Sequence, residues 1–369
     1  MKILINATNI GERLNGLSVY TLSMLKEFVK LDKDNEYLVI LNKAAQTHTL
    51  SINFPVNFKV KYVSRIISPD YGTKGHLLRL LYANYMGFRY RKYLIFTTSQ
   101  MEAIIFHSRQ VIVVQDVIYL MDKKFNKKQY LYYKYLLKIA LKNALAIFTP
   151  SQFTKEEVLK HYHLNPDKIF VTPLGIQRMY YEEIKKENII REKFILYVGR
   201  IAPTKNVLCL LEAYNLIKDK IEERMIVVGN GSREYLDRIK NKGLLTEKVL
   251  IKENAKQVDI LDLYKKAFLF VFPTLYEGFG LPPIEAMACG CPVVISNTTS
   301  LPEVCGDAAI YVDPMNVNSL ADGIMKGLGD IRLREEMIKK GIERAKGYCW
   351  EKTTGETLRV INNIGSSGK

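Results

Sequence analysis

Residues 268–296 read FLFVFPTLYEGFGLPPIEAMACGCPVVIS, and this stretch decides how its half of the chain folds. The apolar run at 268–272 predicts a buried strand, and a loop with two glycines separates it from a short helix that starts near Pro283. Gly290 suits the end of that helix, and Pro292–Ser296 predicts the next strand. A strand, a helix and a strand in this order predict a parallel sheet, whose ligands bind beyond the carboxyl ends of the strands.

The same alternation of short apolar runs and amphipathic stretches extends over the whole chain and restarts once, at Lys193. A polar run at 182–188 precedes the restart and reads as a linker. We therefore predict an α/β protein of two Rossmann-like domains, residues 1–178 and 179–349. The strands expected from the pattern are 2–6, 37–41, 58–63, 93–97, 111–115, 146–150 and 168–172 in the first half and 194–198, 224–228, 248–251, 268–272 and 292–296 in the second.

The positive charge of the chain is concentrated in its first half. The 369 residues include 54 Lys and Arg against 38 Asp and Glu, a formal net charge of +16. Residues 1–180 hold 26 of the basic and 12 of the acidic residues, so nearly all of the excess lies there. Such a field attracts an anionic partner: a nucleic acid, a phosphorylated substrate or an anionic lipid. Because no recognisable nucleic-acid-binding module accompanies the charge, we expect no nucleic acid partner.

The composition is that of a globular protein with sizeable cores, since 48% of the residues are hydrophobic and 25% are charged. No apolar run approaches the roughly 18 residues that a membrane-spanning helix needs. The first apolar run, Lys2–Asn6, is too short for a signal peptide. The five cysteines lie within apolar patterns and read as reduced thiols, so we expect a cytoplasmic protein.

Two carboxylates bracket the loop with the glycines. Glu277 follows the buried strand, and Glu285 is expected in the first turn of the helix. Gly278 and Gly280 let backbone N–H groups approach a ligand closely, and the start of a helix offers unpaired N–H donors to phosphate oxygens. Carboxylates in such a place accept hydrogen bonds from the hydroxyl pairs of a sugar or a ribose. The alternative is a tight turn with a capping glutamate, but two carboxylates around this loop on this scaffold favour a binding site.

A second loop, YVGRIAPTKN at 197–206, carries two basic residues between a predicted strand and a predicted helix. Arg200 and Lys205 can clamp a diphosphate there, because guanidinium and ammonium groups bind phosphate oxygens. A basic loop alone is unremarkable. Together with the loop at 277–281 it indicates phosphate binding.

These segments together resemble the retaining nucleotide-sugar glycosyltransferases of family four. The marker of that family is a pair of glutamates separated by seven residues, here Glu277 and Glu285, around a Gly-Phe-Gly-Leu-Pro loop. The resemblance implies the GT-B fold, in which two Rossmann-like domains face each other across a cleft and the C-terminal segment, here 350–369, packs back on the N-terminal domain. Other matching segments are TPSQFTK at 149–155, VTPLGI at 171–176 and YCWEKT at 348–353.

The resemblance also assigns roles to residues. Glu277 would contact the hydroxyls of the donor sugar, Glu285 the hydroxyls of the ribose, and Arg200 and Lys205 the diphosphate. Gly16, in the loop after the first strand, would let that loop approach the phosphate. The expected donor-binding residues are Gly16, Arg200, Lys205, Glu277, Gly278, Phe279, Gly280, Leu281 and Glu285. The expected catalytic residues are Glu277, Arg200, Lys205 and Asp116.

The chain departs from the family pattern at two places in its first half. The loop Gly16-Leu-Ser-Val-Tyr20 lacks the arginine of the commoner Gly-Ile-Gly-Arg-Tyr, so a basic contact is missing there. Gln115-Asp116 stands where the family usually has His-Asp. Glutamine donates and accepts hydrogen bonds but does not titrate, which excludes a proton shuttle at this position. Asp116 is expected either to align the acceptor or to cap the end of a strand.

Two N-terminal stretches, 79–92 and 123–138, interleave basic and aromatic residues. Tyr and Phe beside Lys suit the headgroup layer of a membrane, and an anionic leaflet attracts basic side chains. We expect peripheral binding at the inner face of the bacterial plasma membrane, where a polyprenyl-diphosphate-linked glycan of a surface polysaccharide would be the acceptor. A solvated helix with buried tyrosines is the alternative. The residues expected to meet the membrane are Lys123, Lys124, Lys127 and Lys128.

We expect no metal and no cofactor besides the nucleoside-diphosphate sugar, which is the donor substrate. Asp32 and Asp34 have the Asp-x-Asp form that binds metal in a different glycosyltransferase fold, but here they read as a solvated turn. Two rival functions remain: a non-catalytic GT-B scaffold and a dinucleotide-dependent oxidoreductase. The second is disfavoured because Gly229-Asn-Gly231 lacks the third glycine of the dinucleotide fingerprint.

Overall fold

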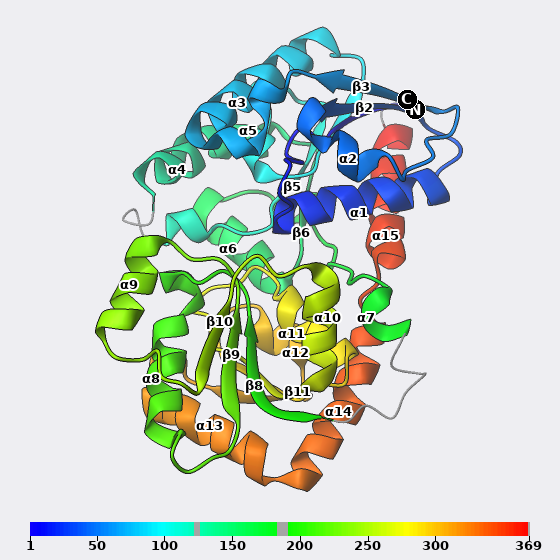
Figure 1. Ribbon diagram of the computed structural model, residues 1–369. Coiled ribbons are helices and arrows are strands. Elements are labelled where there is room, and N and C mark those ends of the chain that lie inside the picture. Colours follow the sequence, from blue (N-terminus) through cyan, green and yellow to red (C-terminus); the bar gives the residue numbers. More distant parts are fainter. Residues whose placement is uncertain (122–125, 183–190, 368–369) are drawn as a thin grey trace. The chain divides into compact units, whose positions relative to one another are not determined.

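The structure is a computed structural model that describes residues 1–121, 126–182 and 191–367 (Figure 1). Two compact units make up the chain: Met1–Gly175 with Trp350–Lys369, which we call the N-unit, and Ile176–Cys349, which we call the C-unit. Lys123, Lys124 and most of the predicted linker at 182–188 lie outside the described residues.

The N-unit contains a seven-stranded sheet with the strand order β3-β2-β1-β4-β5-β6-β7, in which every pair of neighbours is parallel. Because β1, β4 and β5 are neighbours, the side chains at their carboxyl ends lie along one edge of the sheet. The strands are β1 Lys2–Asn6, β2 Glu36–Asn42, β3 Phe58–Val63, β4 Leu94–Thr97, β5 Gln110–Val113, β6 Ala146–Thr149 and β7 Ile169–Val171.

Apolar faces of the N-unit helices cover this sheet. Leu80 of one helix packs with Leu137 and Leu141 of another against Ile112 and Ile147 of the strands. A π-helical turn, Tyr132–Leu137, joins α4 to α5. The helices are α1 Gly16–Leu31, α2 Gln46–Thr49, α3 Gly72–Arg89, α4 Lys127–Leu131, α5 Lys138–Asn143, α6 Gln152–Tyr162 and α15 Trp350–Ser367.

The C-unit repeats the plan with a six-stranded parallel sheet in the order β10-β9-β8-β11-β12-β13. Two such sheets flanked by helices confirm the predicted fold class. The strands are β8 Glu192–Val198, β9 Arg224–Val228, β10 Val249–Lys252, β11 Ala267–Phe272, β12 Val293–Ser296 and β13 Ala309–Val312. The helices are α7 Met179–Glu182, α8 Val207–Ile217, α9 Arg233–Asn241, α10 Gln257–Lys266, α11 Leu281–Ala288, α12 Leu301–Cys305, α13 Val317–Gly329 and α14 Ile331–Lys346.

The C-terminal helix α15 packs on α1 of the N-unit, as the resemblance implies. The Trp350 ring meets the Tyr20 ring edge-on, with 5.7 Å between the ring centres. The Thr353 hydroxyl donates to the Pro173 carbonyl over 2.6 Å. An apolar contact and a partly buried hydrogen bond therefore hold the last helix to the first domain.

The prediction of a solvated turn at Asp32 is wrong. The Asp32 side chain is buried and accepts hydrogen bonds from the Tyr37 hydroxyl and, over 2.7 Å, from the Asn35 amide. Burial acts to raise the pKa of Asp32, but these hydrogen bonds outweigh it and hold the pKa below its usual value. Asn35 also donates to Asn362 of α15 over 3.0 Å, so this turn anchors the C-terminal helix.

Candidate functional site

The two loops singled out in the second half meet at one edge of the C-unit sheet. Lys205 ends a short turn after β8, Glu277 lies in the loop after β11, and β8 and β11 are neighbours in the sheet. The Lys205 ammonium forms an ion pair with the Glu277 carboxylate, and both side chains are largely buried. The ammonium also lies 5.9 Å from the centre of the Phe272 ring. Two residues expected to bind different parts of one donor therefore neutralise each other.

Hydroxyl side chains that sequence reasoning missed hold the loop of Glu277 in place. Ser300 donates to the carbonyls of Glu277 and Phe279 over 3.0 and 2.9 Å. Thr274 donates to the Thr204 carbonyl over 3.1 Å, which ties the loop to the turn of Lys205. Thr274 and Ser300 are fully buried, so their hydrogen bonds fix the backbone around both charged residues.

The loop runs into α11 through Gly280, whose φ of +103° favours glycine. A Cβ at this position would lie 2.5 Å from a side-chain carbon of Leu301. The expected row of N–H donors at the helix start is shorter than predicted, because Pro282 and Pro283 carry no N–H. Backbone donors to a phosphate must therefore come from residues 278–281.

Glu285 lies in the second turn of α11, not in the first, because the helix begins at Leu281. Its carboxylate accepts a hydrogen bond from the Tyr264 hydroxyl over 3.3 Å, and the Tyr180 hydroxyl also bonds to it. Burial raises the pKa of Glu285 to about 7, and the two tyrosine hydroxyls only partly oppose this shift. The two tyrosines were not predicted, since neither is close to Glu285 in the sequence.

One arginine positions the two helices that supply Glu285 and Tyr264. The Arg191 guanidinium donates to the carbonyls of Lys265 and Gly290 over 2.7 and 2.6 Å. These carbonyls lie at the C-terminal ends of α10 and α11, where a cation also interacts favourably with the helix dipoles. Further hydrogen bonds of the same guanidinium go to the carbonyls of Tyr264, Ala267 and Cys289.

Arg200 follows β8 and its side chain is exposed. The Tyr197 hydroxyl donates to the Arg200 carbonyl over 3.0 Å, so the backbone is held from the core side. Among the described residues the Arg200 guanidinium forms no ion pair. Unlike Lys205, the Arg200 guanidinium can bind an anionic ligand without first giving up an ion pair.

The corresponding edge of the N-unit sheet carries neutral polar side chains. Asn6 ends β1, Thr97 ends β4, and Gln115 follows β5, and these three strands are neighbours. The Asn6 and Gln115 amide nitrogens and the Thr97 hydroxyl are buried and have no hydrogen-bond partner among the described residues. Buried donors without partners are uncommon, and they indicate where a ligand or water binds.

The other predicted residues of the N-unit lie in a turn or at the start of a helix. Asp116 accepts a hydrogen bond from the Ile118 N–H over 3.1 Å and so caps the turn after β5. Gly16 does not lie in a loop, since it is the first residue of α1, whose Asn15 cap accepts from the Ser18 N–H over 3.1 Å. Lys127 and Lys128 are exposed at the start of α4.

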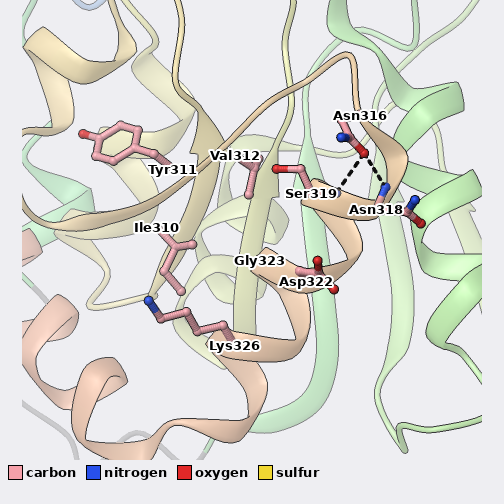
Figure 2. Close-up of a pocket in the computed structure, with 9 residues that line it drawn as sticks. All are labelled: Ile310, Tyr311, Val312, Asn316, Asn318, Ser319, Asp322, Gly323 and Lys326. Carbon is pink, nitrogen blue, oxygen red and sulfur yellow. Dashed lines mark hydrogen bonds between the residues drawn. The ribbon is translucent and has the colours of Figure 1, made fainter.

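The C-unit also has a cavity of about 430 Å³ between β13 and α13 (Figure 2). None of the predicted site residues lines it. Asn316, on its rim, accepts hydrogen bonds from the N–H groups of Asn318 and Ser319 and caps α13. Within the ranges that the structure describes, no three His, Cys, Asp or Glu side chains come together to hold a metal ion.

Two family models match the chain. Residues 14–178 match the model described as Glycosyltransferase Family 4, and residues 181–344 match the model described as Glycosyl transferases group 1. The chain belongs to glycosyltransferase family 4. The two matches cover the N-unit and the C-unit in turn, which confirms the resemblance seen in both halves of the sequence.

The names of several relatives of this chain place those proteins in bacterial O-antigen synthesis. O-antigen chain mannosyltransferase B of Escherichia coli is 33% identical over 233 residues, which cover 60% of this chain and 61% of that protein. O-antigen chain mannosyltransferase RfbU of Salmonella typhimurium is 29% identical over 224 residues, 58% of this chain and 60% of that protein. The chain thus matches less than two thirds of the length of these relatives.

Solved structures share the fold at low sequence identity. Sucrose-phosphate synthase from Thermosynechococcus elongatus has a TM-score of 0.76 and 18% identity, and the match covers 99% of both chains. Anabaena HepE, solved in complex with UDP and glucose, has a TM-score of 0.73 and 18% identity over 98% of this chain and 100% of that one. These neighbours confirm the GT-B fold. In the part of the family 4 chain that the structure describes, no helix is long and apolar enough to cross a membrane.

Proposed function

We propose that this family 4 member is a retaining glycosyltransferase that moves a hexose from a nucleoside-diphosphate donor to a hydroxyl of a lipid-linked glycan. The observation that carries the proposal is the meeting of Lys205 and Glu277 at the ends of neighbouring strands, beside a loop that runs into the helix of Glu285. The names of the relatives support a role in bacterial surface polysaccharide synthesis and make mannose the first donor sugar to test.

In the proposed reaction, the bond between the anomeric carbon and the phosphate oxygen breaks. The acceptor oxygen forms a bond to that carbon on the same face, and the acceptor proton passes to the leaving phosphate oxygen. The products are the glycosylated acceptor and the nucleoside diphosphate. Arg200 and Lys205 stabilise the negative charge that develops on the diphosphate, and we propose that these two cations make a metal ion unnecessary.

When the donor binds, Lys205 and Glu277 give up their ion pair and each takes a group of the donor as its new partner. This exchange costs little free energy. The ammonium turns to the diphosphate, and the carboxylate accepts hydrogen bonds from hydroxyls of the sugar. Each group has a hydrogen-bonded partner before and after binding, so neither charge is left buried alone. Glu285 binds the ribose hydroxyls while Tyr180 and Tyr264 orient its carboxylate.

Neutral hydrogen bonds are proposed for the N-unit. The buried Gln115 amide nitrogen has no acceptor among the described residues, and a sugar hydroxyl would supply one. We assign Asp116 to positioning the turn that follows Gln115. The acceptor is proposed to be polyprenyl-diphosphate-linked, with the enzyme bound peripherally to an anionic membrane surface on the cytoplasmic side, because the positive excess lies in residues 1–180.

The experiment is a panel of nucleotide sugars, GDP-mannose included, in which release of the nucleoside diphosphate is followed with and without EDTA. We expect turnover with one donor and the same rate in EDTA. Loss of turnover in EDTA that Mn²⁺ or Mg²⁺ restores would contradict the metal-independent reaction. Tight binding of a nucleoside diphosphate without hydrolysis or transfer from any donor would favour the non-catalytic scaffold.

A further inference from the structure

An apolar stripe runs along the exposed side of α3. Leu77, Leu81, Tyr85 and Phe88 recur every three or four residues, which places them on one helical face. Between 55% and 79% of each residue is exposed. The other side of the helix packs on the sheet through buried residues such as Ala83 and Met86. Scattered apolar side chains on a surface are ordinary, but a continuous row of them marks a surface that binds something.

A loop that is hydrogen-bonded to α3 carries a second exposed phenyl ring. Phe106 is 83% exposed, although both backbone groups of its neighbour Ile105 are bonded. The Ile105 N–H donates to Asn84 of α3 over 3.0 Å, and the Ile105 carbonyl accepts from Asn143 of α5 over 3.0 Å. Two helices thus hold Phe106 in an exposed place, and its exposure is not that of a loose loop tip.

The segments around the stripe are strongly basic, and Asp70, in the turn just before α3, is an exposed carboxylate next to them. Residues 72–92, 103–110 and 126–145 contain no Asp or Glu. Arg79, which points inward from α3, is paired with the buried Glu102 over 3.0 Å, so the other basic side chains carry the exposed charge. The exposed basic residues of these segments are Lys74, Arg89, Arg91, Lys92, Arg109, Lys127, Lys128, Lys134 and Lys142.

The helix that carries the lysines lies against α3 (Figure 1). Leu80 packs with Leu137 and Leu141, and the His76 ring meets the Tyr132 ring with 5.3 Å between their centres. The ammonium of Lys134 lies 5.6 Å from the centre of the Tyr130 ring. The basic and aromatic residues of 126–145 are therefore neighbours of the α3 stripe, and the two segments form one surface.

We propose that this surface, the α3 face, docks the N-unit on an anionic lipid bilayer. The α3 face consists of Leu77, Leu81, Tyr85, Phe88 and Phe106 with the exposed basic residues around them. Its apolar side chains enter the headgroup layer while the basic ones meet the lipid phosphates. A rim with a large excess of basic residues repels a second copy of itself, which favours lipid over self-association. The inference rests on the proposed lipid-linked acceptor, but docking on lipid needs neither substrate.

The test compares two matched double variants in vesicle sedimentation. F88E/F106E removes two exposed rings from the α3 face, and the control L50E/V56E removes two exposed apolar side chains elsewhere on the N-unit, 78% and 98% exposed. The vesicles contain either phosphatidylethanolamine with phosphatidylglycerol or phosphatidylcholine alone. We expect F88E/F106E to lose about tenfold or more in affinity for the anionic vesicles, because each buried ring contributes through the apolar area removed from water. The control should bind like wild type.

A fluorescent reporter gives a direct reading of the same contact. The only tryptophan, Trp350, is 7% exposed, so its emission is a constant background. Phe88→Trp should shift its emission to shorter wavelength on anionic vesicles, whereas Leu50→Trp should not. Equal vesicle binding by F88E/F106E and wild type, or concentration-dependent dimers that F88E/F106E alone dissociates, would overturn the proposal. Nucleoside-diphosphate binding, measured on the same variants, tests the proposed function separately and should not change.

Discussion

The carboxyl edges of the two sheets carry different chemistry on the same scaffold. In the C-unit the edge is charged: an ion pair between Lys205 and Glu277, an exposed Arg200 and a carboxyl at Glu285 whose pKa is about 7. In the N-unit the Asp116 carboxylate caps a turn, and the buried groups at the edge that have no partner among the described residues are neutral amides and a hydroxyl. Parallel sheets bind ligands at this edge in both cases, so the side chains decide which ligand is bound.

We therefore expect charged ligands to depend on the C-unit edge, and Lys205→Ala should have the largest effect. It removes a cation and leaves Glu277 unpaired beside the phosphates. Loss of one group that stabilises developing charge reduces kcat by about 10²–10³-fold. Steady-state kinetics with the donor found by the nucleotide-sugar panel would measure this.

A double variant separates the loss of the Lys205 cation from the exposure of the Glu277 carboxylate. K205A/E277Q should recover part of the loss in donor binding, because the neutral amide does not repel phosphate. Lys252→Ala, at the carboxyl end of the edge strand β10, is the matched control and should leave the kinetics unchanged. Wild-type kinetics in K205A would contradict the assignment of Lys205.

The features of the two edges that could be predicted from sequence are those that lie within short contiguous segments. Glu277, Glu285 and the loops at 197–206 and 277–281 are contiguous motifs, and the alternating pattern gives both parallel sheets. The parts that could not be predicted depend on residues distant in sequence. Tyr180 and Tyr264 meet Glu285 only through the packing of α7 and α10 beside α11.

The burial of Asp32 was missed for a different reason. Its partners Asn35 and Tyr37 are close in sequence, but the link from Asn35 to Asn362 joins residues at opposite ends of the chain. The polar composition of this turn, taken alone, predicts that its side chains are exposed to solvent. Buried polar residues with complete hydrogen bonding look like turn residues in a single sequence.

The second largest effect should be on stability, through Glu285. Its folded-state pKa of about 7 lies above the usual value of a free Glu, so between these values the folded protein binds more protons than the unfolded chain. The free energy of unfolding therefore falls as pH rises towards 7 and stays lower above it, by about 3 kcal/mol in all. Glu285→Gln cannot ionise, so it should raise Tm at pH 8 and change it little at pH 5.

Thermal unfolding at the two pH values measures this effect. Glu335→Gln, on the exposed side of α14, is the control and should show no such pH dependence. The same Glu285→Gln variant should bind nucleoside diphosphate more weakly, because the amide accepts fewer hydrogen bonds from ribose than a carboxylate does. A variant less stable than wild type at pH 8 would contradict the account of this carboxyl.

The smallest effect is expected at the neutral edge, from Gln115→His. Histidine can also donate a hydrogen bond, so the rate should stay within about tenfold of wild type, but its ordinary pKa of about 6.5 adds a titration. The ratio of variant to wild-type kcat should therefore change between pH 6 and pH 8. A ratio that is constant with pH would show that position 115 does not contact the reacting sugars.

The most direct test of the charged and neutral edges is calorimetric binding of the nucleoside diphosphate to Arg200→Ala and Gln115→Leu. Arg200 is exposed and forms no ion pair among the described residues, so its removal should leave the fold intact. We expect about 10- to 100-fold weaker binding for Arg200→Ala, because one charge-assisted hydrogen-bonding group is lost, and unchanged binding for Gln115→Leu. Unchanged binding by Arg200→Ala together with a large loss in Gln115→Leu would contradict it.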